Sequence, residues 1–473
     1  MSGEKIVANG VNGFTGQYLV PPLDPAEVAA RAKEPPEDPA VAAQLRHLHT
    51  AMTEETFGVP FDVDPSKVEQ AGWAVVFSTE EGDDVKTAVE PLVEHRLQRV
   101  GDARTKVLEH RPGEGWHEWL ARHRTAPGNV EPDKVPYYVL LIGGPDRIPF
   151  SLQYLLDTEY AVGRLDFDDA DAYGRYVAGL IDYEGADAAP HDAAATFFGT
   201  RHAFDGATQL SADSLVTPLT QSFQPGGRFA SAVSRYRVDQ VLGDPATKAS
   251  LGEIFSGSGA SGRPALFFSA SHGMGGWPSG HADQRARHGA LLCQDWPGIG
   301  QIGETQYFAA SDLPADACVH GLVAFFFACF GAGTPQQDSF VHQPGRPPPE
   351  LAPEAFVGAL PKSLLSHPEG GALAVIGHID RAWGYSFVSG GEAQLLPFQN
   401  ALGRILLGEP VGHAMKDFNE KYAALSANLS SVLEDVGFGE QIANGVLAAL
   451  WTEHSDSQNY IVLGDPAATL RTS

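Results

Sequence analysis

Seven consecutive apolar residues, Leu322 to Ala328, precede a cysteine in the stretch GLVAFFFACFGAG, and this run constrains the fold most. A run of this length without a polar residue is typical of a strand covered on both faces, as in parallel α/β sheets. Comparable apolar runs predict further strands at 73–78, 105–110, 136–144, 195–200, 264–273 and 371–378. Because amphipathic helical patterns such as 84–101 and 169–184 separate them, the sequence predicts an α/β fold with a mostly parallel sheet and helices on both faces.

Cys329 follows the apolar run directly and is followed by a small-residue turn, Gly331 to Gly333. In open α/β sheets, ligands bind beyond the carboxyl ends of the strands, where a thiol on a glycine-rich turn is placed to act as a nucleophile. A free cysteine is also a common small hydrophobic core residue. This segment alone leaves both interpretations open.

A nucleophilic cysteine needs a base, and histidine is the usual one. The stretch ALFFSASHG places His272 and Gly273 after another buried strand. If the two strands are neighbours in a parallel sheet, His272 and Cys329 meet at one edge. The backbone N–H groups of Gly273 and Cys329 would then form an oxyanion hole.

The first part of the chain, residues 1–68, is rich in proline and charge and is expected to be an extension, with a helical patch near 40–55. Its Gly10, Gly13 and Gly16 resemble a dinucleotide-binding loop only weakly. Such a loop must open a helix, and the prolines at 21 and 22 come too soon for one.

The amino-acid composition argues against several classes of partner and favours one type of compartment. The formal net charge of −27 argues against nucleic acid or an anionic membrane as the main partner. Three cysteines in 473 residues provide no disulfide framework and suit a reducing compartment. No signal peptide or membrane span is evident, so a cytoplasmic location is expected. His272, His281 and His288 do not match a metal-binding spacing, and neither a metal nor a cofactor is expected.

Several motifs resemble those of the caspase/gingipain clan of cysteine peptidases, and of gingipains in particular. His-Gly at 272–273 and ACFG at 328–331 resemble the clan's catalytic motifs. YYVLLIGGPDRIP, TEYAVGRLDFDDADAYGRYVAGLIDYE, LLGEPVGHAMKDFNEKY and YIVLGDPAATL resemble other gingipain segments. The resemblance implies two tandem α/β subdomains, here 69–190 and a catalytic subdomain with a helical tail at 191–473. It also implies a structural calcium ion, although the sequence contains no EF-hand or similar calcium-binding loop.

The resemblance also implies roles for individual residues. His272 would be the general base and acid, Cys329 the nucleophile, and Glu159 the carboxylate that supports the histidine. An ordinary strand-edge carboxylate is the alternative for Glu159.

The resemblance also bears on substrate specificity. Asp171, with Asp169 and Asp168 as neighbours, would line an S1 pocket for arginine, although the run DFDDAD is also typical of a helix start. Trp277 would be a wall of that pocket or an exposed aromatic residue.

We therefore expect a cytoplasmic cysteine endopeptidase that cleaves after arginine or lysine, with a protein or peptide as substrate. As a protease within a cell it would be restrained by an inhibitory or activating protein partner, as in regulated effectors of stress or defence. The alternatives are a catalytically silent binding or scaffold module of the same fold and a thiol acyltransferase.

Overall fold

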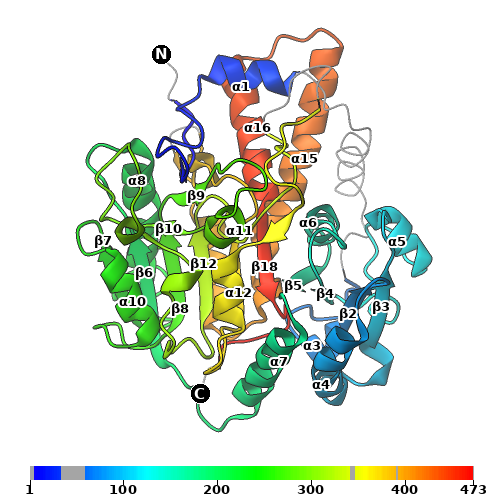
Figure 1. Ribbon diagram of the computed structural model, residues 1–473. Coiled ribbons are helices and arrows are strands. Elements are labelled where there is room, and N and C mark those ends of the chain that lie inside the picture. The colour runs from blue at the N-terminus through cyan, green and yellow to red at the C-terminus, as the bar shows by residue number, and fades with distance from the viewer. Residues whose placement is uncertain (1–4, 34–58, 341–346, 390–391, 472–473) are drawn as a thin grey trace.

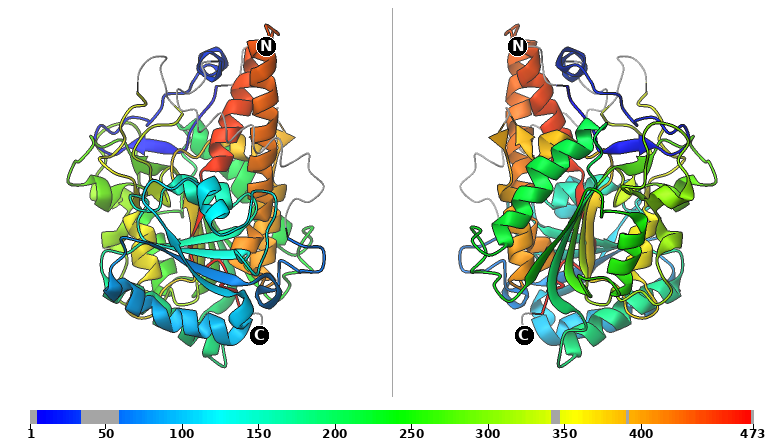
Figure 2. Two further views of the ribbon diagram at one scale, coloured as in Figure 1. Left: turned by 90° about the vertical axis from the view of Figure 1, so that its right-hand side faces the viewer. Right: turned by 90° about the vertical axis from the view of Figure 1, so that its left-hand side faces the viewer.

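The computed structural model describes residues 5–33, 59–340, 347–389 and 392–471. A ten-stranded sheet runs through these residues, with helices on both faces (Figures 1 and 2). In order across the sheet, its strands are β3 (Thr105–His110), β2 (Trp73–Ser78), β4 (Tyr138–Ile142), β5 (Ala161–Leu165), β18 (Tyr460–Gly464), β15 (Ala374–His378), β12 (Val323–Phe327), β8 (Pro264–Ala270), β6 (Asp192–Gly199) and β7 (Arg237–Leu242). The mostly parallel α/β sheet expected from the sequence is confirmed.

One antiparallel pair, β15 with β18, divides this sheet into two blocks of opposite direction. β2, β3, β4, β5 and β18 run one way, and β6, β7, β8, β12 and β15 run the other way. The carboxyl ends of β8 and β12 therefore lie at the same edge as the amino end of β5. The carboxyl end of β5 lies at the opposite edge.

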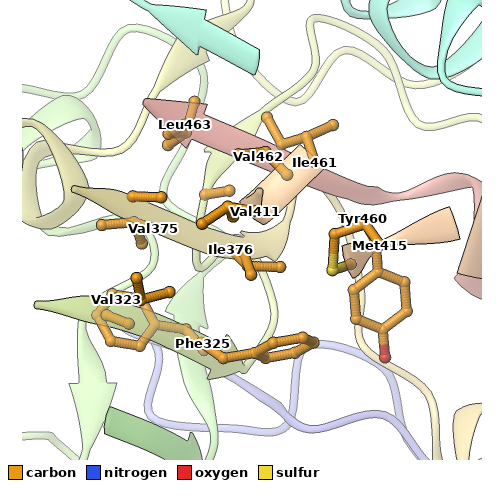
Figure 3. Packing of buried hydrophobic residues seen from close by; sticks show 14 of the residues in the cluster. Val323, Phe325, Val375, Ile376, Val411, Met415, Tyr460, Ile461, Val462 and Leu463 are labelled. Atoms are coloured by element: carbon orange, nitrogen blue, oxygen red, sulfur yellow. The ribbon is translucent and has the colours of Figure 1, made fainter. Parts of the chain in front are cut away.

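The core is centred where the two blocks meet. Figure 3 shows Val323 and Phe325 of β12 beside Val375 and Ile376 of β15 and the apolar residues of β18. All of these side chains are almost completely buried. Burying each of these apolar side chains stabilises the fold by about 1.5–3 kcal/mol, which explains why the sequences of these strands are unbroken apolar runs.

The helices follow amphipathic patterns. They include α4 (Asp83–Val100), α7 (Ala170–Gly185), α10 (Lys248–Ser256), α12 (Ala359–Leu365), α13 (Leu396–Leu406), α15 (Lys416–Gly437) and α16 (Asn444–Gln458). In α4, Val85, Val89 and Leu92 share the buried face, and acidic residues occupy the first turn, where the helix dipole favours them. In the part of the chain that the structure describes, no helix is long and apolar enough to cross a membrane.

The amino-terminal arm crosses the edge formed by the carboxyl ends of β8 and β12. Its strand β1 (Gly10–Asn12) pairs in parallel with β9 (Gly273–Gly275), in a small sheet that continues through β10 (Leu291–Leu292) and β11 (Tyr307–Phe308). Its helix α1 (Pro25–Ala32) packs on α16. The helical patch expected near 40–55 lies outside the described residues, and the boundaries at 68 and 190 stay predictions.

Candidate active site

His272 and Cys329 follow two strands that pair directly. β8 and β12 are parallel neighbours with Ala270 opposite Phe327, and each candidate residue comes two positions later. Phe330, just after the cysteine, has a left-handed backbone (φ 58°), which costs a non-glycine residue about 1–3 kcal/mol. Strain of this kind persists where the surrounding structure fixes a turn, and here the turn places the Cys329 thiol and N–H at the edge of the sheet.

The Cys329 side chain is completely buried. The Ala382 N–H lies 3.3 Å from its Sγ and donates a hydrogen bond to it. Burial raises the pKa of the Cys329 thiol to about 12, against the opposing effects of a backbone hydrogen bond with Ala382 and the charge of Arg381. In this arrangement the thiol is protonated at neutral pH, so attack requires a base that removes its proton.

His272 is also completely buried, and its Nε2 lies 2.8 Å from Oδ2 of Asp205. A carboxylate only accepts hydrogen bonds, so Nε2 carries a proton that it donates to Asp205. In the neutral imidazole this leaves Nδ1 as the basic nitrogen, and Nδ1 has no hydrogen-bond partner among the described residues. His272 is therefore held in the tautomer that a general base requires.

Asp205 is positioned by several donors. Its Oδ1 accepts a hydrogen bond from the Tyr18 hydroxyl (2.9 Å), and its Oδ2 accepts one from the Thr208 N–H (3.0 Å), which makes Asp205 the N-cap of α8 (Gly206–Ser211). Burial acts to raise the pKa of Asp205, but His272 and the bonds from Thr208 outweigh it and hold that pKa below its ordinary value. The carboxylate thus stays ionised opposite the imidazole.

Glu159, expected from the resemblance to support His272, does not contact it. Glu159 comes just before β5, and β18 and β15 lie between β5 and β12 in the sheet. Its side chain lines a separate cavity of about 560 Å³, together with Tyr137 and His413. Burial raises the pKa of Glu159 to about 7, against a backbone hydrogen bond from Gly128. Asp205, which follows β6 beside β8, occupies the place that the sequence analysis gave to Glu159.

The three aspartates proposed for S1 lie at the wrong edge of the sheet. They follow β5, whose carboxyl end is opposite that of β12, and α7 lies at the far end of the molecule from β9 (Figure 1). Asp169 caps α7 by accepting from the Ala172 N–H, and Asp168 pairs with Lys362. Asp171 is exposed in the first turn of the helix. The alternative of a helix start is thus correct for this run.

Trp277 is buried rather than exposed, and it packs on the amino-terminal arm. A β-carbon built on Gly13 would lie 2.1 Å from Trp277 Cη2. The ring therefore covers the arm at Gly13, and it also packs on His288.

The arm itself occupies the site, which the sequence analysis did not anticipate. The carbonyl oxygen of Asn9 accepts hydrogen bonds from the N–H groups of Gly273 (2.9 Å) and Cys329 (3.2 Å). These are the two groups expected to form an oxyanion hole, and they converge on one peptide oxygen. The only sequence signal was Gly10 itself, a residue without a side chain in a polar, proline-rich region.

Metal ligands do not gather in the described part of the chain. No three His, Cys, Asp or Glu side chains there are placed to hold an ion. His288 instead shares a hydrogen bond with the Thr334 hydroxyl. Calcium also binds backbone and amide oxygens, so the structural calcium that the resemblance implied stays a prediction.

The chain is similar in fold to solved cysteine proteinases. The Arg-specific cysteine proteinase gingipain R (RgpB) aligns with 86% of this chain and 80% of its own, at a TM-score of 0.47 and 14% identity. The complex of the pro- and mature domains of Porphyromonas gingivalis RgpB aligns with 85% and 80%, at a TM-score of 0.44 and 13% identity. The Saccharomyces cerevisiae separase–securin complex aligns with 70% of this chain and 15% of that one, at a TM-score of 0.27 and 10% identity. No protein-family model and no curated protein matches the chain.

Proposed function

We propose that this chain is a cysteine endopeptidase with Cys329 as nucleophile, His272 as general base and acid, and Asp205 as the carboxylate that orients the histidine. The observation that supports this most is the Asn9 carbonyl, whose oxygen accepts from two backbone N–H groups beside a buried thiol. A peptide carbonyl held in this way is polarised for attack.

The reaction follows from the hydrogen bonds of the site. Nδ1 of His272 takes the proton of the Cys329 thiol, and the thiolate attacks the carbonyl carbon. The negative oxygen that forms is held by the N–H groups of Gly273 and Cys329. Imidazolium then protonates the leaving amine, and water hydrolyses the thioester. Asp205 remains ionised throughout and compensates the positive charge on His272.

The site also offers a backbone edge for a peptide. After β15, the Ala382 carbonyl and the Gly384 N–H point to the strand that occupies the site, and both bond to its backbone. Binding an extended peptide through main-chain hydrogen bonds is a common recognition mode and depends little on sequence. Because the strand continues past the thiol in both directions, an internal peptide bond fits the site. Control by a second protein stays a prediction.

The test is peptide hydrolysis and thiol labelling by an electrophilic peptide probe. Because the arm covers the site, the wild type is compared with Ile6→Asp, which puts a charge on a completely buried arm residue and should dislodge the arm. Asn9→Pro serves the same purpose if Ile6→Asp folds poorly, because proline lacks the N–H that bonds to Ala382.

We expect hydrolysis and labelling in an arm-released form and neither in the same form carrying Cys329→Ala. Cys293→Ala is the matched control, since Cys293 is equally buried and lies outside the site. Hydrolysis that survives Cys329→Ala, or its absence from every form, would show that the chain is not a cysteine peptidase.

A further inference from the structure

We propose that residues 6–9 are bound as a substrate, that the enzyme cleaves its own chain between Asn9 and Gly10, and that its S1 pocket accepts asparagine. This inference rests on the proposed function and adds to it a cleavage site and a substrate class.

The backbone of the arm makes the hydrogen bonds that a substrate strand needs. The Asn9 N–H donates to the Ala382 carbonyl (2.8 Å), and the Gly384 N–H donates to the Val7 carbonyl (3.1 Å). Ala8 forms an antiparallel bridge with Trp383 between these two bonds. With the Asn9 oxygen in the oxyanion hole, Asn9 occupies the position whose carbonyl is attacked.

The thiol lies against the peptide bond that follows Asn9. A β-carbon built on Gly10 would be 2.7 Å from Cys329 Sγ, so the sulfur faces Gly10 directly and a side chain there would displace it. Beyond this point the strand continues along β9, with Gly10 opposite Gly273 and Asn12 opposite Gly275. The arm is therefore held on both sides of the Asn9–Gly10 bond, with the nucleophile beside it.

The pocket that holds the Asn9 side chain favours a side chain that donates a hydrogen bond. Asn9 is 1% exposed, and its Nδ2 donates to Ser211 Oγ at 3.4 Å. The Ser211 hydroxyl donates its own proton to the Thr208 carbonyl (3.2 Å), so it faces Asn9 as an acceptor. A P1 aspartate would place a buried carboxylate against this acceptor, which is unfavourable. The pocket thus pairs the Asn9 amide nitrogen, leaves its Oδ1 without a partner among the described residues, and suits an uncharged hydrogen-bond donor.

The cleavage step is an ordinary hydrolysis. The Cys329 sulfur forms a bond to the Asn9 carbonyl carbon, the bond to the Gly10 nitrogen breaks, and that nitrogen receives the proton that His272 took from the thiol. Water then converts the thioester to the Asn9 carboxylate and restores the thiol. The part after the cut stays anchored, since Leu19 N–H bonds to the Gly10 carbonyl and the Tyr18 hydroxyl bonds to Asp205. Residues up to Asn9 keep only non-covalent contacts, including the paired backbone bonds of Ile6 and Leu23.

The test follows the amino termini of the full chain by mass spectrometry after purification and incubation. We expect a new terminus at Gly10 in the wild type, formed at a rate independent of protein concentration, and none in Cys329→Ala. Asn9→Asp should slow the cut at least about tenfold, because the pocket offers no donor to the new carboxylate. Asn–Gly bonds also rearrange without an enzyme, so the chain's other Asn–Gly pairs serve as internal controls.

Asn444–Gly445 is the matched control, because it is preceded by the same alanine and Asn444 is exposed outside the site. Asn444→Asp should leave the cut at Asn9 unchanged. Cutting in Cys329→Ala, or equal cutting at Asn444, would mean spontaneous chemistry and overturn the inference. An uncut arm in a chain whose Ile6→Asp form hydrolyses peptides would overturn self-cleavage while leaving the peptidase standing. Failure of both cutting and hydrolysis would reject the proposed function as well.

Discussion

At the scale of single residues, Asp205 connects three separate parts of the site. Its carboxylate accepts from the His272 imidazole, the Tyr18 hydroxyl and the Thr208 backbone. The Asp205 carboxylate therefore fixes the histidine tautomer, caps the start of α8 and holds the arm at Tyr18. Because these contacts share two oxygens, the orientation of the histidine depends on the start of the helix and on the docking of the arm.

Asp205→Asn should lower kcat/KM by about 10²- to 10⁴-fold, because it removes the charge that compensates the imidazolium and turns one acceptor into a donor. Asparagine is as good an N-cap as aspartate, so the start of α8 should be kept. The measurement is peptide hydrolysis by the Ile6→Asp form with and without the substitution.

Glu159→Gln is the matched control, since it neutralises a buried carboxylate that lines a different cavity. Its kcat/KM should stay close to that of the parent protein. If Glu159→Gln were the more damaging change, the assignment from sequence resemblance would be right and the one from geometry wrong.

At the scale of elements, the positions of the strands can be predicted from the sequence because buried strands consist of continuous apolar runs. The sequence predicts Cys329 because it directly follows such a run, and His272 because it follows another run after three small residues, Ser269 to Ser271. Strand order and direction are not encoded locally. The antiparallel pair of β15 and β18 reverses half of the sheet, which moved Asp171 to the far edge, and the pairing of β6 with β8 brought Asp205 to the histidine.

The arm was missed for a different reason. β1 is three residues long and contains no apolar run, and its partner β9 lies more than 250 positions away in sequence. Gly10 was interpreted as part of a weak nucleotide-loop pattern, whereas here it allows the close approach of the Cys329 sulfur. A contact that depends on the absence of a side chain leaves little trace in a single sequence.

α8 joins the proposed catalytic carboxylate to the proposed S1 pocket, because Asp205 caps its start and Ser211 ends it. On fluorogenic peptides that carry residues 6–8 before P1, asparagine should be preferred over arginine, lysine and aspartate by about 10- to 100-fold. Ser211→Ala leaves the buried amide of P1 asparagine without its acceptor and should reduce this preference by a similar factor.

Ser222→Ala, on the following helix α9 (Thr217–Phe223), is the control, because its hydroxyl bonds to a local backbone carbonyl and should not affect P1 choice. A preference for arginine that persists in Ser211→Ala would contradict the asparagine pocket and leave the catalytic residues unaffected.

At the scale of the whole molecule, the last strand ties the two blocks together. β18 lies between β5 and β15, so the chain must reach its final residues before the sheet is continuous. Asp465, just after β18, accepts hydrogen bonds from Trp73 Nε1 on β2 (3.0 Å) and from Arg96 Nε on α4 (2.9 Å). Arg96 also makes paired bonds to Glu184 on α7. A buried arginine thus joins three elements at the far edge from the catalytic residues.

Arg96→Met should lower the free energy of unfolding by about 3–5 kcal/mol at neutral pH, because it leaves Asp465 buried without its cation and leaves Glu184 with only His95 and the more distant Arg99. Burial opposes ionisation of Glu184, but the charge of Arg96, together with hydrogen bonds from His95 and Arg96 and the charge of Arg99, outweighs it and lowers the pKa of Glu184 to about 2. This carboxylate therefore stabilises the wild type above its unfolded pKa of about 4.3, and that contribution is lost as pH falls toward 2. The deficit of Arg96→Met in urea unfolding should accordingly be largest above pH 5 and shrink in acid. Arg201→Met, which removes an exposed partner of Asp213, should unfold like the wild type. A deficit that did not shrink in acid would place the cost in lost packing rather than in the unpaired charges.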